Sequence, residues 1–167
     1  MANGISTRDY GLTFVIEPSA SVRPGVAFTL PIIVAVRPIG SASNDPFQQL
    51  GANVSLRDET GATSCPGLTG SVTSSVRSQL GNTTSGYALF GPLTIANPGK
   101  YRIRVMLAAH TYSGSTTTAS ITSAVIHVHA EAPVSQRPTP VQVAKLQSLI
   151  SENIHISQVQ IAAWQQA

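Results

Sequence analysis

Apolar and polar residues alternate along much of this chain, and the alternation limits the folds that it can adopt. Over residues 101–107 the odd positions are apolar, whereas Arg102, Arg104 and Met106 occupy the even positions. A period of two predicts a strand with one buried face. The same pattern predicts further strands over residues 10–17, 28–36, 54–56, 87–90, 93–95 and 121–129.

The first predicted strand and the segments between strands carry more specific expectations. The alternation places four apolar residues of the first strand on one face: Tyr10, Leu12, Phe14 and Ile16. Residues 97–99 form a predicted turn, in which Pro sets one φ and Gly supplies the positive one. Residues 62–86 are rich in Ser, Thr, Gly and Asn, which predicts a long, mobile loop with one short strand. Residues 111–118 are predicted to form a polar loop.

Near the end of the chain the apolar residues recur at helical spacing, at Val143, Leu146, Leu149 and Ile150. This change of period predicts a helix over residues 139–153. Thr139 suits the N-cap, and Pro140 suits the first helical position. Residues 154–156 alternate again and predict a short closing strand, and residues 159–167 predict a helical or frayed tail.

Six or more short strands and one late helix predict an all-β sandwich or barrel. The 167 residues are enough for one domain that buries roughly two-thirds of its unfolded surface. Neither an internal repeat nor a linker divides the sequence. We therefore expect a single domain over residues 1–167, with its core over about residues 10–157.

Composition excludes several classes of protein. Charged residues make up only 10% of the chain and the net charge is +3, far from the footprint of an obvious nucleic-acid binder. No apolar run approaches the roughly 18 residues that span a membrane, and the first residues hold no apolar signal core. The single cysteine, Cys65, excludes an internal disulfide and favours a reducing compartment. The sequons at Asn53 and Asn82 are expected to be chance matches.

His127 and His129 are the candidates for a metal site, because a strand would place both imidazoles on one face. No carboxylate or cysteine lies at a matching distance, and the other two histidines, at positions 110 and 155, are far away in sequence. We therefore expect two exposed or half-buried strand histidines and no metal.

Motifs for catalysis are missing from the sequence. It has no G-x-S-x-G elbow, no Walker loop and no dinucleotide fingerprint. Its seven carboxylates are widely spread, which leaves little material for a paired acid–base site. The expectation is a protein that is not an enzyme, with no catalytic residue, no cofactor and no small-molecule substrate.

The basic residues are the remaining functional signal. Sandwich loops gather at two ends, so loop arginines can converge into one patch, and residues 100–104 add a stripe at strand spacing. The alternative is scattered solubilising charge, with arginine stems covering a sheet face. The candidate contacts to DNA phosphate are Arg23, Arg37, Arg57, Lys100, Arg102 and Arg104.

The apolar stripe of the late helix has two interpretations. Such a stripe most often closes the core of its own domain. It also suits an interface that extends the core across a subunit boundary. The candidate partner-interface residues are Val143, Leu146, Leu149 and Ile150.

Several segments, in order along the chain, resemble one family. The stretch Pro98-Gly-Lys-Tyr-Arg-Ile-Arg-Val105 is similar to the Gly-x-Tyr-Arg-Leu-x-Phe motif of the velvet domain, found in fungal regulators of development and secondary metabolism. Arg23 and Gly25 resemble the Arg and Gly that follow the family's first strand. Further segments that resemble the family are residues 10–18, 31–34, 90–93, 123–128, 137–140, 146–149 and 153–156.

The resemblance implies an immunoglobulin-like, Rel-like β-sandwich that forms homo- or heterodimers with another velvet-domain protein, and DNA binding in some members. Members that bind DNA carry a basic stretch before the Pro-Ile-Val strand, whereas residues 26–30 here hold no Lys or Arg. Arg23 is the basic residue that matches by motif position.

The leading hypothesis is a non-enzymatic, velvet-like transcriptional regulator domain of the nucleus and cytoplasm. It would act by dimerisation and modest binding of double-stranded DNA, in the control of development, sporulation and secondary metabolism, without contacting a membrane. One alternative is a module of the same fold that contacts only proteins. The other is a secreted or surface β-sandwich.

Overall fold

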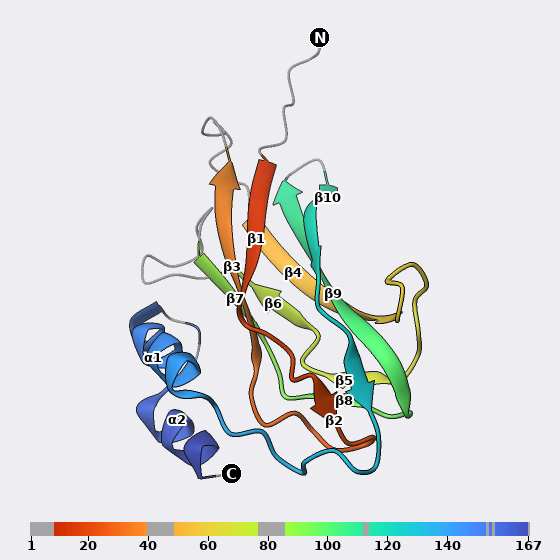
Figure 1. The fold of residues 1–167 in the computed structure, drawn as a ribbon. Helices are drawn as coiled ribbons and strands as arrows, with labels where there is room; N and C mark the ends of the chain where they lie inside the picture. The colour runs from red at the N-terminus through yellow and green to blue at the C-terminus, as the bar shows by residue number, and fades with distance from the viewer. Residues whose placement is uncertain are drawn as a thin grey trace.

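The computed structural model describes residues 9–39, 49–76, 86–111, 114–152, 154 and 156–166. It is a β-sandwich followed by two helices (Figure 1), so the predicted class, a β-sandwich with a late helix, is confirmed, and a second helix follows the predicted one. The smaller sheet contains, in order, β1 (Asp9–Ile16), β3 (Ile32–Ile39) and β7 (Gly86–Phe90).

The larger sheet has the strand order β2 (Ser21–Val22), β11 (Ile126–Val128), β9 (Gly99–Thr111), β4 (Gln49–Asp58) and β6 (Thr73–Ser75). A further strand, β10 (Gly114–Thr122), also pairs with β9. A separate pair joins β5 (Leu68–Gly70) to β8 (Leu93–Ile95). The helices are α1 (Pro140–Ser148), a 3-10 turn η1 (Ile150–Glu152) and α2 (Gln158–Gln165).

The main core lies between the two sheets. The predicted apolar face of β9 supplies Ile103, Val105 and Leu107, and all three are fully buried. Val34 of β3 and Phe90 of β7 meet them from the smaller sheet. Burial of these apolar side chains is the main force that holds the two sheets together.

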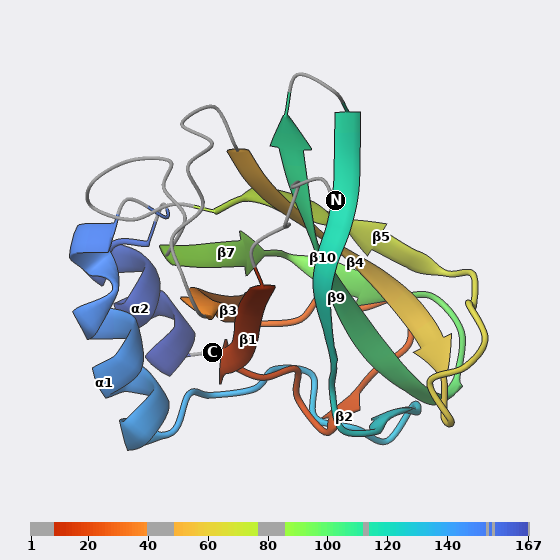
Figure 2. The same cartoon turned by 90° about the horizontal axis from the view of Figure 1, so that it is seen from above.

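A second core lies on the other face of the smaller sheet, which α1 and α2 cover (Figure 2). Ile33 of β3 packs there with Leu146 and Leu149, next to Ile161 of α2. Because β3 is buried on both faces, its sequence from Ile32 to Val36 is continuously apolar and lacks polar alternation. The capping box of α1 follows the sequence expectation, since Gln142 N–H donates to Thr139 Oγ1 at 3.2 Å.

One expectation about the first strand is wrong. Tyr10, Leu12 and Phe14 belong to the main core, but Ile16 packs in the second core with the helices. The register between β1 and β3 shifts between Phe14 and Ile16. A β-bulge adds a residue and so reverses the face of every side chain that follows it.

Four expectations about secondary structure are also corrected. Residues 62–86 contain two short strands, β5 and β6, where one was expected, and residues 77–85 lie outside the described part. Within residues 111–118 the described positions are strand, because β9 and β10 form a long hairpin. The single strand expected over residues 121–129 is interrupted where the buried Ser123 Oγ accepts the Ile103 N–H at 3.0 Å. Neither Ile154 nor Ile156 lies in a strand, although both are buried.

Candidate nucleic-acid interface

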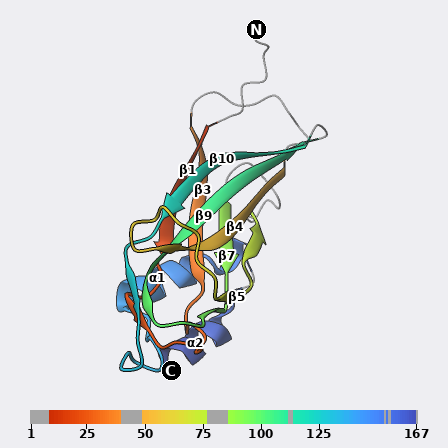
Figure 3. The same ribbon diagram turned by 90° about the vertical axis from the view of Figure 1, so that its right-hand side faces the viewer.

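The outer face of the larger sheet is the surface on which most predicted phosphate contacts meet. The helices cover the smaller sheet on one side of the molecule, whereas β9 and β10 lie on the other side (Figure 2). Figure 3 views the molecule from that other side, with β9 and β4 running side by side. Alternation on β9 directs its apolar residues inward and leaves Lys100, Arg102 and Arg104 on the outer face.

Strand register brings a fourth cation to the same place. Arg57 on β4 is the direct cross-strand partner of Arg102 on β9, and Ser55 is the partner of Arg104. Directly paired residues of antiparallel strands project from the same face. The Arg57 Nε–H also donates to Ser55 Oγ at 3.3 Å, which keeps its stem along β4.

The remaining strands extend this surface toward β2. His127 on β11 pairs with Lys100 on one side and with Ser21 on the other, so it shares their face. Arg23 follows Ser21 by two residues, and its Nε–H donates to the Ala132 carbonyl beyond β11. We call the residues Arg23, Arg57, Lys100, Arg102 and Arg104 the basic face.

Two arginines of the basic face also hold the turn that follows β4. Arg102 Nε–H donates to Glu59 O at 2.7 Å and its Nη1 donates to Ser123 O at 3.0 Å. Arg104 Nη2 donates to Gly61 O at 2.8 Å. A guanidinium has five N–H donors, so these bonds fix both side chains and leave further donors for a ligand.

Carboxylates do not neutralise this surface. Among the described residues, none of the five cations of the basic face forms an ion pair with an acidic side chain. The nearest carboxylate along the chain, Asp58, accepts hydrogen bonds from Thr60 Oγ1 at 2.6 Å and from the Ala62 N–H at 3.2 Å. The Thr60 bond is the main cause that lowers the pKa of Asp58. The Asp58 carboxylate is therefore held in the turn that follows β4.

The structure separates the other candidates from this surface. Arg37 is exposed, but it lies on β3 in the smaller sheet, opposite Gly11. Among the partner-interface candidates, Leu146 and Leu149 are buried in the second core, so the core-closing interpretation holds for them. Val143 packs against the same cluster and Ile150 is 38% exposed.

Sequence reasoning missed the relation between the histidines and the cations. The rings of His127 and His129 have centroids 4.3 Å apart and planes tilted by 36°, and His127 lies opposite Lys100 in the sheet. Their strand spacing predicted one shared face, but the sequence did not show that β9 would be the neighbour. Within the described ranges, no group of three or more His, Cys, Asp or Glu side chains is placed to hold a metal ion.

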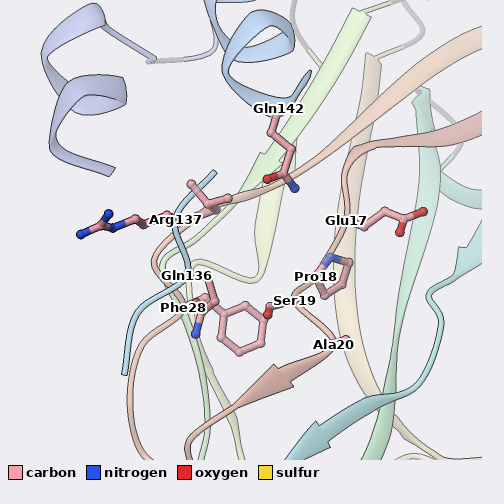
Figure 4. A pocket seen from close by; sticks show the side chains of 9 residues that line it. Glu17, Pro18, Ser19, Ala20, Phe28, Gln136, Arg137 and Gln142 are labelled. Carbon is pink, nitrogen blue, oxygen red and sulfur yellow. The ribbon is translucent and has the colours of Figure 1, made fainter. Parts of the chain in front are cut away.

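The described part of the molecule has two notable hollows, one near α1 and one on the larger sheet. A cavity of about 240 Å³ lies between the end of β1 and the start of α1. Figure 4 shows the Glu17 carboxylate and the Arg137 guanidinium pointing to opposite sides of it. The Gln136 amide oxygen there accepts the Thr29 N–H, so its lining serves the fold. A wider hollow of about 490 Å³ lies beside Asn53 and Ala108 on the larger sheet.

Comparisons with known proteins leave the family open. No family model and no curated protein matches the chain. A similar solved structure is a cohesin module from the family 33 glycoside hydrolase of Clostridium perfringens ATCC13124. It is 8% identical, with a TM-score of 0.39, over 78% of this chain and 100% of that one. In the described part of the chain, no helix has the length and hydropathy to cross a membrane.

Proposed function

We propose that this chain is a non-enzymatic, velvet-like regulator domain that binds DNA phosphate through its basic face. The observation that carries the proposal is the convergence of Arg57, Lys100, Arg102 and Arg104 on one sheet face, where no carboxylate of the described residues pairs with them. Unneutralised cations on one face attract a polyanion and release its counterions. Residues 26–30 hold no basic residue, but in this proposal β4 and β9 supply the cations that contact phosphate.

The expected affinity is modest and depends on salt. Each phosphate contact contributes about −0.9 to the slope of log K against log salt, so five contacts give a slope of about −4.5. The described helices cover the smaller sheet, so among the described residues no helix lies on this face to enter a groove of the duplex. Phosphate contacts position a protein on DNA but carry no sequence information, so discrimination between duplex sequences should be weak.

The test is a fluorescence-anisotropy titration of a short labelled DNA duplex at low and near-physiological salt. The double variant Arg57→Gln/Lys100→Gln removes two cations that hold no turn, so the fold should persist. It should bind more weakly at low salt and reduce the salt slope by about 2. The proposal is overturned if the wild-type domain does not bind the duplex at low salt. It is also overturned if the double variant binds the duplex as tightly as the wild type.

Arg37→Gln is the matched control. It removes one positive charge from the smaller sheet and changes the net charge as each single substitution of the test does. If affinity follows total charge alone, one substitution at Arg37 will weaken binding as much as one at Lys100. The proposal requires that Arg37→Gln bind like the wild type.

Dimerisation with a second velvet-type domain, and action in the nucleus, are the other parts of the proposal. Exposed aliphatic side chains on the helices support a contact there: Val141 is 65% exposed and Val159 is 79% exposed. Light scattering of the purified domain over a range of concentrations tests self-association. If the Arg57→Gln/Lys100→Gln variant retains wild-type association while DNA binding is absent in both proteins, the function is that of a protein-interaction module.

A further inference from the structure

The histidine pair gives the basic face an aromatic surface. His127 on β11 is exposed and His129, just after β11, is half-buried, and their rings lie close together, tilted by 36°. Within the described ranges, neither imidazole forms a hydrogen bond with another residue. Two neighbouring rings at the surface, without side-chain hydrogen bonds in the described part of the chain, retain polar edges and ring surface for a ligand.

Cations border this aromatic surface on both sides. Lys100 lies directly opposite His127 on β9, and Arg23 follows Ser21, the partner of His127 on β2. Neighbouring strands are about 4.8 Å apart, so the backbone of Lys100 lies about one strand spacing from that of His127, and the chain that leads to Arg23 runs beside β11 on its other side. A ligand that contacts all of them needs anionic groups on both sides of a flat, stackable group.

We propose that this end of the basic face binds single-stranded nucleic acid, with a base stacked on the His127–His129 pair and phosphates on Lys100 and Arg23. Unpaired bases stack on aromatic side chains, histidine included, while cations follow the backbone. In a duplex the base faces are already stacked on each other and are inaccessible to a flat protein surface. The inference rests on the proposed function, because both use the same cations.

The experiment compares three labelled probes of equal length, about ten nucleotides: oligodeoxythymidine, an abasic strand with the same number of phosphates, and a duplex. The wild-type domain should bind oligodeoxythymidine about tenfold more tightly than the abasic strand. Its affinity for the duplex should come from phosphate contacts alone, without a contribution from base stacking. An abasic strand that binds as tightly as oligodeoxythymidine overturns base stacking.

Paired variants separate stacking from charge. His127→Phe/His129→Phe keeps two aromatic rings without a titratable group, and His127→Gln/His129→Gln keeps polarity without rings. The Phe variant should retain the preference for oligodeoxythymidine over the abasic strand, and the Gln variant should lose it. Loss in both variants, with thermal unfolding unchanged, overturns the role of the rings.

Failure of this inference differs from failure of the proposed function. If the abasic strand and the duplex bind and respond to Arg57→Gln/Lys100→Gln while the base preference is missing, phosphate binding stands and stacking falls. If none of the three probes binds at low salt, the basic face is not a nucleic-acid surface and both proposals fall.

Discussion

Arg57 and Arg102 lie directly opposite each other on the paired strands β4 and β9. Like charges in this position are destabilising, yet neither side chain is paired with a carboxylate among the described residues. Arg102 is instead held by the carbonyls of Glu59 and Ser123. The sheet therefore maintains two repelling cations at its surface, which an anionic ligand would relieve.

Replacement of Arg57 by Gln should make the domain more stable while weakening its affinity for a polyanion. The expected gain is about a few tenths of a kcal/mol, because the pair is partly exposed and screened by solvent. Urea unfolding at low salt measures it, and the gain should shrink at high salt. A loss of stability at low salt would show that the Arg57 stem contributes more by packing than its charge costs.

Asp58 should stabilise the turn after β4 only while it is ionised. Its folded-state pKa is lowered from 3.8, chiefly by the hydrogen bond from Thr60. A lowered folded pKa gives stability that is present above the unfolded value and is lost as the pH falls through the folded value. Thermal unfolding of Asp58→Ala should therefore lie below the wild type at neutral pH, and the two should converge in strong acid.

Leu146→Ala should be the costly substitution on the helical side. Leu146 is fully buried in the second core, and removal of a buried leucine side chain costs about 2–5 kcal/mol. Val159→Ser is the comparison, because Val159 is exposed on α2 and surface changes stay within about 0.5 kcal/mol. Chemical denaturation of both variants measures the difference. Equal stabilities would mean that α1 does not close the core in solution.

Gly70 should tolerate no side chain. A Cβ at this position would lie 2.0 Å from Pro92 O, and the φ of Gly70 is +115°. Gly25→Ala is the matched control, since its φ is also positive, at +73°, but nothing lies within 4 Å of the added carbon. The control should lose about 1–2 kcal/mol, whereas Gly70→Ala should lose considerably more by thermal unfolding. Similar losses would show that β5 and β8 separate easily.

The strands with one buried face were the part of the fold that sequence patterns predicted well. On β9 the alternation from Ile103 to Leu107 matches the observed burial, because side-chain direction in a strand follows from its local geometry. Ile16 departs from its pattern because a bulge against β3 reverses the faces. A bulge depends on the partner strand, which local sequence does not specify.

The polar hairpin of β9 and β10 was missed for a related reason. Residues 114–118 are Gly, Ser and Thr, a composition that also suits loops. Their strand conformation comes from pairing with β9, where Thr117 lies opposite Ala108. The backbone hydrogen bonds of this pairing leave no periodic pattern of apolar residues in the sequence.

The sequence by itself determined which residues turn inward and which cations turn outward on each strand, because backbone geometry alternates side chains with a period of two. It also determined the start of the late helix, where Thr139 and Pro140 act through local hydrogen bonding and a fixed φ. Only the tertiary structure decided that Arg57 faces Arg102, that His127 faces Lys100, and that Arg37 lies apart from both pairs. Strand order and register join residues distant in the chain, and they are set by how the two cores pack as a whole.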